Sequence, residues 1–305
     1  MRISTNTIYQ SGINKISELQ SDQSRRQQQL STGKRILSPS DDPVASSRAL
    51  EIKQALATNA QFANNRVIAQ NQLSMVDNVL DSVSDLVLSI QSTMVSAGNS
   101  SYNNSERSYM ASEIRASLDQ LIGLANTKDG AGHYLFSGFE NTTPAYAKSA
   151  TGATYQGDNH QQFLQVSNGR KMAISDTGKN IFQGNGADVF KTLNDLANLL
   201  DTPVNTAADR TALTAGLATA DTNMQQTLDN ILNARAIAGT KLKELDGIET
   251  AGQDAILQLS KTLSGLEDLD YAQAISDLTK QQTILSAAQQ SFVKTTSLSL
   301  FNYIQ

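Results

Sequence analysis

Residues 69–97 read AQNQLSMVDNVLDSVSDLVLSIQSTMVSA and place an apolar side chain at alternating steps of four and three. Nine consecutive positions follow this spacing: Ala69, Leu73, Val76, Leu80, Val83, Val87, Ile90, Met94 and Ala97. The spacing puts all nine on one narrow face of a helix, which is typical of a coiled coil. Weaker matches continue back through Phe62, Ala55 and Ile52. We therefore expect one long helix from Pro43 to about Ala97, with Asp42 as its N-cap.

A second apolar run of the same kind extends from Leu213 to Leu266. Two long apolar helix faces need partners, and the nearest candidates are each other. The sequence therefore predicts a mainly α fold: an elongated rod of antiparallel coiled coil or helical bundle. Gly239, Gly247 and Gly252 weaken the second helix, and they either allow close packing or mark a break.

The middle of the chain differs in character from both runs. Residues 130–186 are rich in Gly, Asn and Thr, and short alternating runs occur at 133–136, 162–166 and 171–174. Asn168-Gly169 separates two of these runs and is a strong two-residue hairpin signal. We expect a small β-rich insertion between helices at 105–128 and 189–200.

The two ends of the chain predict weak helices. Residues 1–38 place Gln23 and Arg26 on their most apolar face, and the helix from about Asp270 onward alternates apolar and polar core positions. Those positions are Ile275, Leu278, Gln282, Leu285, Gln289, Phe292 and Thr296. Isolated helices are marginal in water even with good sequences. We therefore expect both ends to be disordered in the free monomer and to become helical when neighbours add apolar surface.

The order of these parts predicts five segments with both chain ends at the same end of the rod. They are an N-terminal assembly helix (1–42), an ascending rod (43–129), a β-rich insertion (130–187), a returning rod (188–266) and a C-terminal assembly helix (267–305). The acidic residues Glu267, Asp268 and Asp270 are interpreted as a cap region of the last helix.

Composition limits the possible functions. Of the 305 residues only 5% are aromatic and none is Trp, which favours thin cores of Ala, Leu, Ile and Val. A net charge of −5 without a basic stripe argues against nucleic acid, and no stretch approaches the ~20 apolar residues of a membrane span. The first 16 residues do not read as a secretory signal peptide, which makes the cytoplasm the default location.

The search for reactive groups predicts no enzyme. The chain has no Cys, and His133 and His160 lack the carboxylate or thiol neighbours of a metal site. Asp129-Gly130-Ala131-Gly132 is best interpreted as a turn. We therefore predict no catalytic residue, no cofactor and no metal.

Short motifs at both ends resemble the bacterial flagellin family. They are LSTGKRI (30–36) with SDDP (40–43), and LEDLDY (266–271) with SLSLFNY (297–303). MRIST (1–5) and YLFSG (134–138) are similar, more narrowly, to family members that join the flagellar hook to its filament. Pro43-Val44-Ala45 stands where flagellins usually carry Ala-Ala-Gly.

The resemblance implies a structural subunit without catalysis. Such proteins form a ring of subunits between hook-associated protein 1 and flagellin, with their terminal helices in the inner tube. The resemblance also implies export in unfolded form by the flagellar type III system without signal cleavage, a cytoplasmic chaperone on the C-terminal helix, and a final extracellular location.

We expect the contacts between subunits to lie on the terminal helices. The assembly residues predicted are Ile16, Leu19, Leu30, Leu278, Leu285, Phe292, Leu298 and Phe301. Two alternatives remain open. One is a flagellin-type filament subunit, and the other is an adhesin-like module that binds a ligand through the β-rich insertion.

Overall fold

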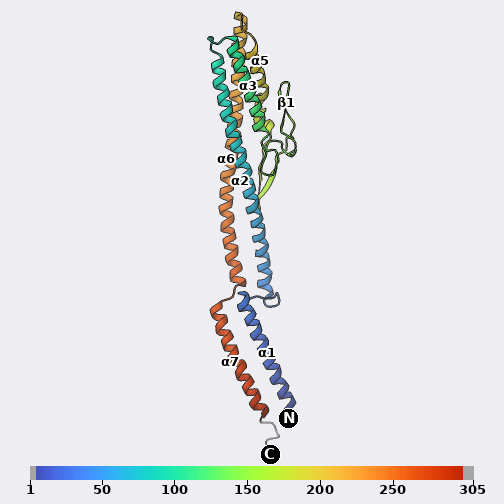
Figure 1. Cartoon of the computed structure of the whole chain (residues 1–305). Helices are drawn as coiled ribbons and strands as arrows, with labels where there is room; N and C mark the ends of the chain where they lie inside the picture. The colour runs from blue at the N-terminus through green and yellow to red at the C-terminus, as the bar shows by residue number, and fades with distance from the viewer. Residues whose placement is uncertain (1–4, 298–305) are drawn as a thin grey trace, which may run out of the picture. The chain divides into compact units, whose positions relative to one another are not determined.

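The computed structural model describes residues 5–297 and is mainly α-helical, with two small antiparallel sheets (Figure 1). In chain order the elements are α1 (Thr5–Thr32), α2 (Pro43–Ala97), α3 (Asn104–Ala125), β1 (Tyr146–Ser149), β2 (Gly152–Tyr155), β3 (Phe163–Ser167), β4 (Arg170–Ala173), α4 (Gly178–Phe182), the 3₁₀ turn η1 (Gly184–Gly186), α5 (Val189–Asp201), α6 (Ala207–Glu267) and α7 (Tyr271–Ser297). The predicted fold class, long packed helices with a small β-rich insertion, is confirmed.

The chain forms two compact units. The first contains the described parts of residues 1–58 and 254–305, and the second contains residues 59–253. The helices α2 and α6 contribute to both units. The five segment boundaries drawn from the sequence are not tested by this division and stay predictions.

In the second unit, the apolar face of α2 is buried along the length of the core. All nine residues predicted for it, from Ala69 to Ala97, are at most 4% exposed. Arg235 of α6 joins α2 through Asp77 (Nε to Oδ1, 3.0 Å) and Asp81 (Nη1 to Oδ1, 2.7 Å). Arg66 and Glu249 form a second ion pair farther along (2.5 Å), so the two helices run antiparallel, as predicted.

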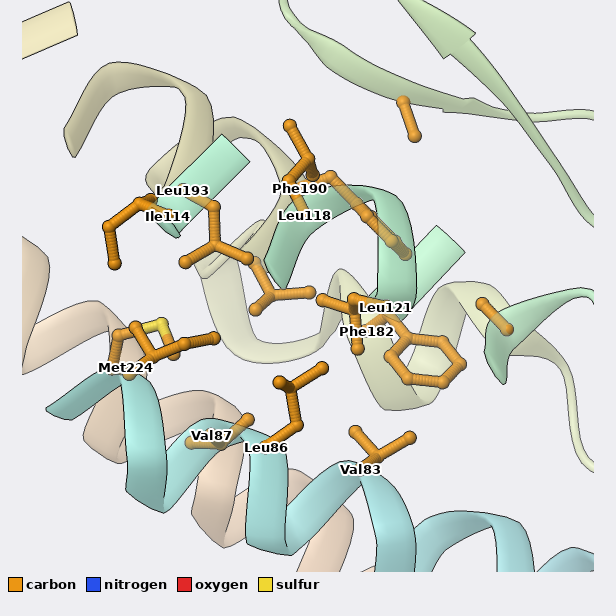
Figure 2. Packing of buried hydrophobic residues seen from close by; sticks show 14 of the residues in the cluster. Val83, Leu86, Val87, Ile114, Leu118, Leu121, Phe182, Phe190, Leu193 and Met224 are labelled. Atoms are coloured by element: carbon orange, nitrogen blue, oxygen red, sulfur yellow. The ribbon is translucent and has the colours of Figure 1, made fainter. Parts of the chain in front are cut away.

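The helices α3, α4 and α5 pack against α2 and α6 and complete this core. Figure 2 shows side chains from five helices that meet there. They include Val83, Leu86, Val87, Ile114, Leu118, Leu121, Phe182, Phe190, Leu193 and Met224.

One part of the core is not thin. Phe136, Tyr146, Phe182 and Phe190 are fully buried together, with ring centroids 4.4 Å apart between Tyr146 and Phe190. The prediction of a thin aliphatic core is therefore wrong beside the insertion. A short irregular segment has few side chains, so large rings are needed to fill the space beneath it.

The insertion contains two hairpins. Strands β3 and β4 pair around the predicted Asn168-Gly169 turn, and their buried Val166 and Met172 pack on Leu73 of α2 and Leu245 of α6. The hairpin of β1 and β2 was not predicted. Residues 133–136 are not a strand, because only Tyr134 makes an isolated bridge, to Lys128.

Helix boundaries differ from prediction by a few residues. The first helix ends at Thr32 rather than residue 38, and α3 spans Asn104–Ala125 rather than 105–128. The α6 helix is continuous through all three glycines. Of the two readings left open, close packing holds at Gly252, where a Cβ would lie 2.7 Å from Nη2 of Arg66.

Candidate assembly surface

In the first unit, α1 and α7 form an antiparallel pair. The rings of Tyr9 and Phe292 lie 5.1 Å apart, and Arg26 of α1 lies 3.9 Å from Asp277 of α7. The start of α1 therefore lies beside the end of α7. Gly12 makes room for the ring of Phe292, since a Cβ on Gly12 would lie 2.5 Å from the Cδ2 atom.

Few side chains are fully buried between α1 and α7. Six of the predicted assembly residues face the opposite helix and are only half-buried: Ile16, Leu19, Leu30, Leu278, Leu285 and Phe292. Among the described side chains of these helices, only Gln29 and Ala274 are buried. Leu298 and Phe301 lie outside the described residues. A role for all eight residues in contacts between subunits stays a prediction.

One row of the predicted α7 face is shifted by one position. Ile275, Gln282 and Gln289 are exposed, and Ala274, Gln281 and Ala288 face α1 in their place. The other row, Leu278, Leu285 and Phe292, lies as predicted. Small side chains at 274 and 288 allow the backbones to approach, which the apolar pattern alone does not indicate. The Oε1 atom of Gln281 is buried without a hydrogen-bond partner among the described residues.

The pair leaves apolar surface in contact with solvent. Ile275, Ile284 and Val293 on α7 are 56%, 44% and 63% exposed, and Tyr9 on α1 is 47% exposed. Residues 5–14 and 281–293 contain no charged side chain and no His. Solvent-facing helix surfaces normally carry charges on their outer positions, so this end of the pair resembles a contact surface.

At the other end of α1 and α7, two loops of the first unit are hydrogen-bonded to each other. The Arg35 amide donates to the Glu267 carbonyl (2.7 Å), and the Leu269 amide donates to the Gly33 carbonyl (2.9 Å). Lys34 and Asp268 form an isolated antiparallel bridge. Gly33 has a φ of +69°, which a side chain would disfavour, and Tyr271 packs against it. This contact holds the turn after α1 to the turn before α7.

Glu267 is the centre of this loop contact. Its carboxylate is mostly buried and accepts hydrogen bonds from Lys53 and from Lys34 (3.0 Å). These bonds, the one from Lys53 foremost, hold the pKa of Glu267 below its usual value. The interpretation of Glu267 as a cap of the last helix is therefore wrong: it ends α6, and Asp270 makes the cap through the Gln273 amide (3.1 Å).

Asp41 and Asp42 fix the start of α2. Asp42 accepts from the Ala45 amide (2.9 Å), which confirms it as the N-cap of the helix that begins at Pro43. Asp41 accepts from the Leu37 and Ser38 amides (2.9 and 3.1 Å) and pairs with Arg25 (3.1 Å). The amide hydrogen bonds lower the pKa of both carboxyl groups. A turn-binding role for Asp41 was not predicted, although the Ser-Pro-Ser-Asp turn signal was available.

Neither a side-chain group able to hold a metal ion nor a helix able to span a membrane occurs in the part of the chain that the structure describes. Within residues 5–297, no three His, Cys, Asp or Glu side chains lie close enough to hold a metal ion. Over the same residues, no helix has both the length and the apolar character that a membrane crossing requires.

Comparison with known proteins places these features in a class. Residues 3–141 match the bacterial flagellin N-terminal helical region. This match, together with curated relatives that are flagellar structural proteins, defines a structural protein of the flagellum, not an enzyme. The chain is 33% identical to flagellar hook-associated protein 3 of Escherichia coli strain K12, over 99% of each chain. The chain belongs to the family of flagellar hook-associated protein 3.

Two further proteins are similar to this chain, one in sequence and one in fold. A flagellin of Listeria monocytogenes is 22% identical over 93% of this chain and 92% of its own. The crystal structure of hook-associated protein 3 from Legionella pneumophila superposes with a TM-score of 0.67 at 20% identity. The superposition covers 70% of this chain and 98% of the Legionella chain. A substantial part of this chain therefore has no counterpart in the Legionella structure.

Proposed function

We propose that this chain is a subunit of the junction between flagellar hook and filament, and that it assembles through α1 and α7. The family membership carries the junction role, because the full-length identity is to hook-associated protein 3. A filament subunit is the second candidate, and it is less well supported because the identity to the flagellin is lower, 22% against 33%.

The thin pairing of α1 and α7 supports a role for these helices in assembly. Half-buried Leu and Ile side chains keep apolar area that a neighbouring subunit can cover, at about 25 cal/mol per Å² removed from water. The uncharged stretches at 5–14 and 281–293 could be covered by such a neighbour without desolvating a charge. Proposed partners are further copies of this chain in a ring, hook-associated protein 1 on one side and flagellin on the other.

Export in unfolded form by the flagellar type III system is part of the same proposal. The lack of cysteine supports it, since no disulfide can obstruct passage of an extended chain. The exposed apolar residues Ile275, Ile284 and Val293 offer a cytoplasmic chaperone a binding face on α7. The subunit would leave the cell without signal cleavage and act outside it.

Addition to isolated hooks tests the junction role. Purified full-length protein is mixed with hooks that carry hook-associated protein 1 and with hooks that lack it, and bound protein is measured after sedimentation. We expect retention only on the first preparation, and filaments of added flagellin only after this protein has bound. Equal retention on both preparations, or long filaments made of this protein alone, would contradict the proposal.

A deletion strain gives the matching test in cells. Loss of filament attachment with flagellin shed into the medium is expected, and the full-length chain should restore attachment. Normal filaments in the deletion strain would exclude a junction role.

A further inference from the structure

A cavity of about 490 Å³ lies in the second unit, where the loop after α2 meets the first turns of α6. Its lining contains two arginines, Arg107 and Arg210, several amide and hydroxyl groups, and no Asp or Glu. A cavity wall with two positive charges and no negative charge is unexpected in a chain whose net charge is −5.

Arg107 is a buried cation that pairs with no carboxylate of the residues that the structure describes. The residue is only 6% exposed, and its guanidinium donates to the Tyr102 carbonyl and to Oδ1 of Asn104, both at 2.7 Å. Its Nε atom is buried and has no acceptor among the described residues. Burying a charge is costly unless an opposite charge or a full set of hydrogen bonds compensates it. Here the chain supplies only part of that compensation.

Arg210 lies on the first turns of α6 and is exposed. Among the described residues its side chain has no ion-pair or hydrogen-bond partner, and only its backbone is bonded, to Thr206 and Thr214. Two arginines thus line one cavity, of which Arg107 is buried and Arg210 is exposed.

The nearby carboxylates already accept hydrogen bonds from backbone amides at the starts of helices. Glu106 accepts from the Asn103 amide (2.7 Å), and Asp209 accepts from the Asn205 and Thr206 amides (3.0 and 2.8 Å). Neither carboxylate lines the cavity. The negative charge that would balance Arg107 is therefore not supplied by the neighbouring helix starts.

Asn104 is hydrogen-bonded to residues on both sides of the cavity. Its Oδ1 accepts from the Val204 amide (3.0 Å) as well as from Arg107, and its Nδ2 donates to Asn205 (3.2 Å). The guanidinium of Arg107 is thereby held in place at the cavity before any ligand arrives. Preorganised donors of this kind favour binding, because little order has to be created on association.

We propose that this cavity binds an oxyanion, a phosphate or carboxylate group, between Arg107 and Arg210. Guanidinium groups bind both anions through paired N–H donors. Asn99, Ser100 and Thr214 add hydrogen-bonding side chains, and Leu213 and Leu217 offer apolar contact to the rest of a small organic ligand. The ligand would connect the loop after α2 to the start of α6 and stabilise that end of the second unit.

Calorimetric titration of the full-length protein tests the site. The probes are inorganic phosphate and citrate, each added at constant ionic strength with sodium chloride as the balancing salt. Saturable binding of either probe is expected, and a preference between them distinguishes a phosphate site from a carboxylate site. We expect Arg210→Gln to weaken binding roughly tenfold or more, since it removes a charge-assisted contact.

Arg48→Gln is the matched control, because Arg48 is also exposed and does not line the cavity. The control should bind like the wild type, and both variants should keep the wild-type unfolding midpoint, since each changes an exposed side chain. Hydrogen exchange of residues 98–104 should slow when phosphate or citrate is added. Absence of saturable binding by both probes, or equal affinity of the wild type and Arg210→Gln, would overturn the proposal.

Discussion

Glu267 shows how one side chain can hold two distant parts of the sequence together. Its carboxylate forms ion pairs with Lys34 in the loop after α1 and with Lys53 of α2. Its backbone carbonyl accepts a hydrogen bond from the Arg35 amide. Both lysines are about half exposed, so each ion pair by itself is weak. The carboxylate is mostly buried and pairs with both lysines at once, so its loss would weaken the contact that the backbone hydrogen bonds also hold.

Replacing this carboxylate tests its role. We expect Glu267→Gln to destabilise the loop contact by about 1–2 kcal/mol, because two charge-assisted hydrogen bonds become neutral ones. Hydrogen exchange at the Arg35 and Leu269 amides should accelerate accordingly. Glu51→Gln is the control, since Glu51 is an exposed acid on α2 of the same unit. Equal exchange in both variants would show that Glu267 does not hold the loops.

Acidification should release the same contacts. The pKa values of Asp41, Asp42 and Glu267 are lowered in the folded chain. A lowered pKa means that the unfolded chain binds protons more readily, so the stabilisation is complete above the unfolded pKa values of about 4. It is lost as the pH falls below them. Hydrogen exchange of residues 33–42 between pH 7 and pH 3, corrected for intrinsic rates, should show protection falling below about pH 4. Constant or rising protection would contradict this assignment.

The helices differ sharply in how well they are buried. Leu80 in the α2 face is fully buried, whereas Leu285 in α7 is half-buried against a single helix. Apolar spacing predicts which residues face inward, but it does not state how many neighbours they meet.

A matched pair of leucine substitutions separates the two kinds of helix. Leu80→Ala should lower the free energy of unfolding of the monomer by about 2–5 kcal/mol, because it leaves a cavity in a closed core. Leu285→Ala should leave it within about 0.5 kcal/mol, as for other surface changes, yet reduce retention on hooks that carry hook-associated protein 1. Urea unfolding and the sedimentation assay give the two readings. A large loss of monomer stability with Leu285→Ala would place α7 in the stable core.

The sequence pattern correctly predicted those elements that are encoded by residues close together in the chain. The α2 face and the Asn168-Gly169 hairpin are correct because apolar steps of four and three, and a two-residue turn sequence between two alternating runs, are local signals. The shift of one α7 row to Ala274, Gln281 and Ala288 was not predictable, because at positions 274 and 288 close backbone approach selects small side chains over large apolar ones. Similarly, the contact of Glu267 with Lys53 depends on tertiary proximity, which no local pattern encodes.

Taken as a whole molecule, the chain combines a second unit with a closed core and a first unit whose terminal helices share few buried side chains. The export and assembly that we propose would benefit from terminal helices that unfold easily before assembly and become ordered afterwards. We propose that α1 and α7 gain most of their stability from neighbouring subunits.

Hydrogen exchange measured by mass spectrometry on the purified monomer and on the same protein bound to hooks tests this claim most directly. We expect the amides of residues 5–32 and 271–297 to exchange rapidly in the monomer and slowly after binding, while residues 69–97 stay protected in both. Protection of the terminal helices in the dilute monomer equal to that of residues 69–97 would contradict the account.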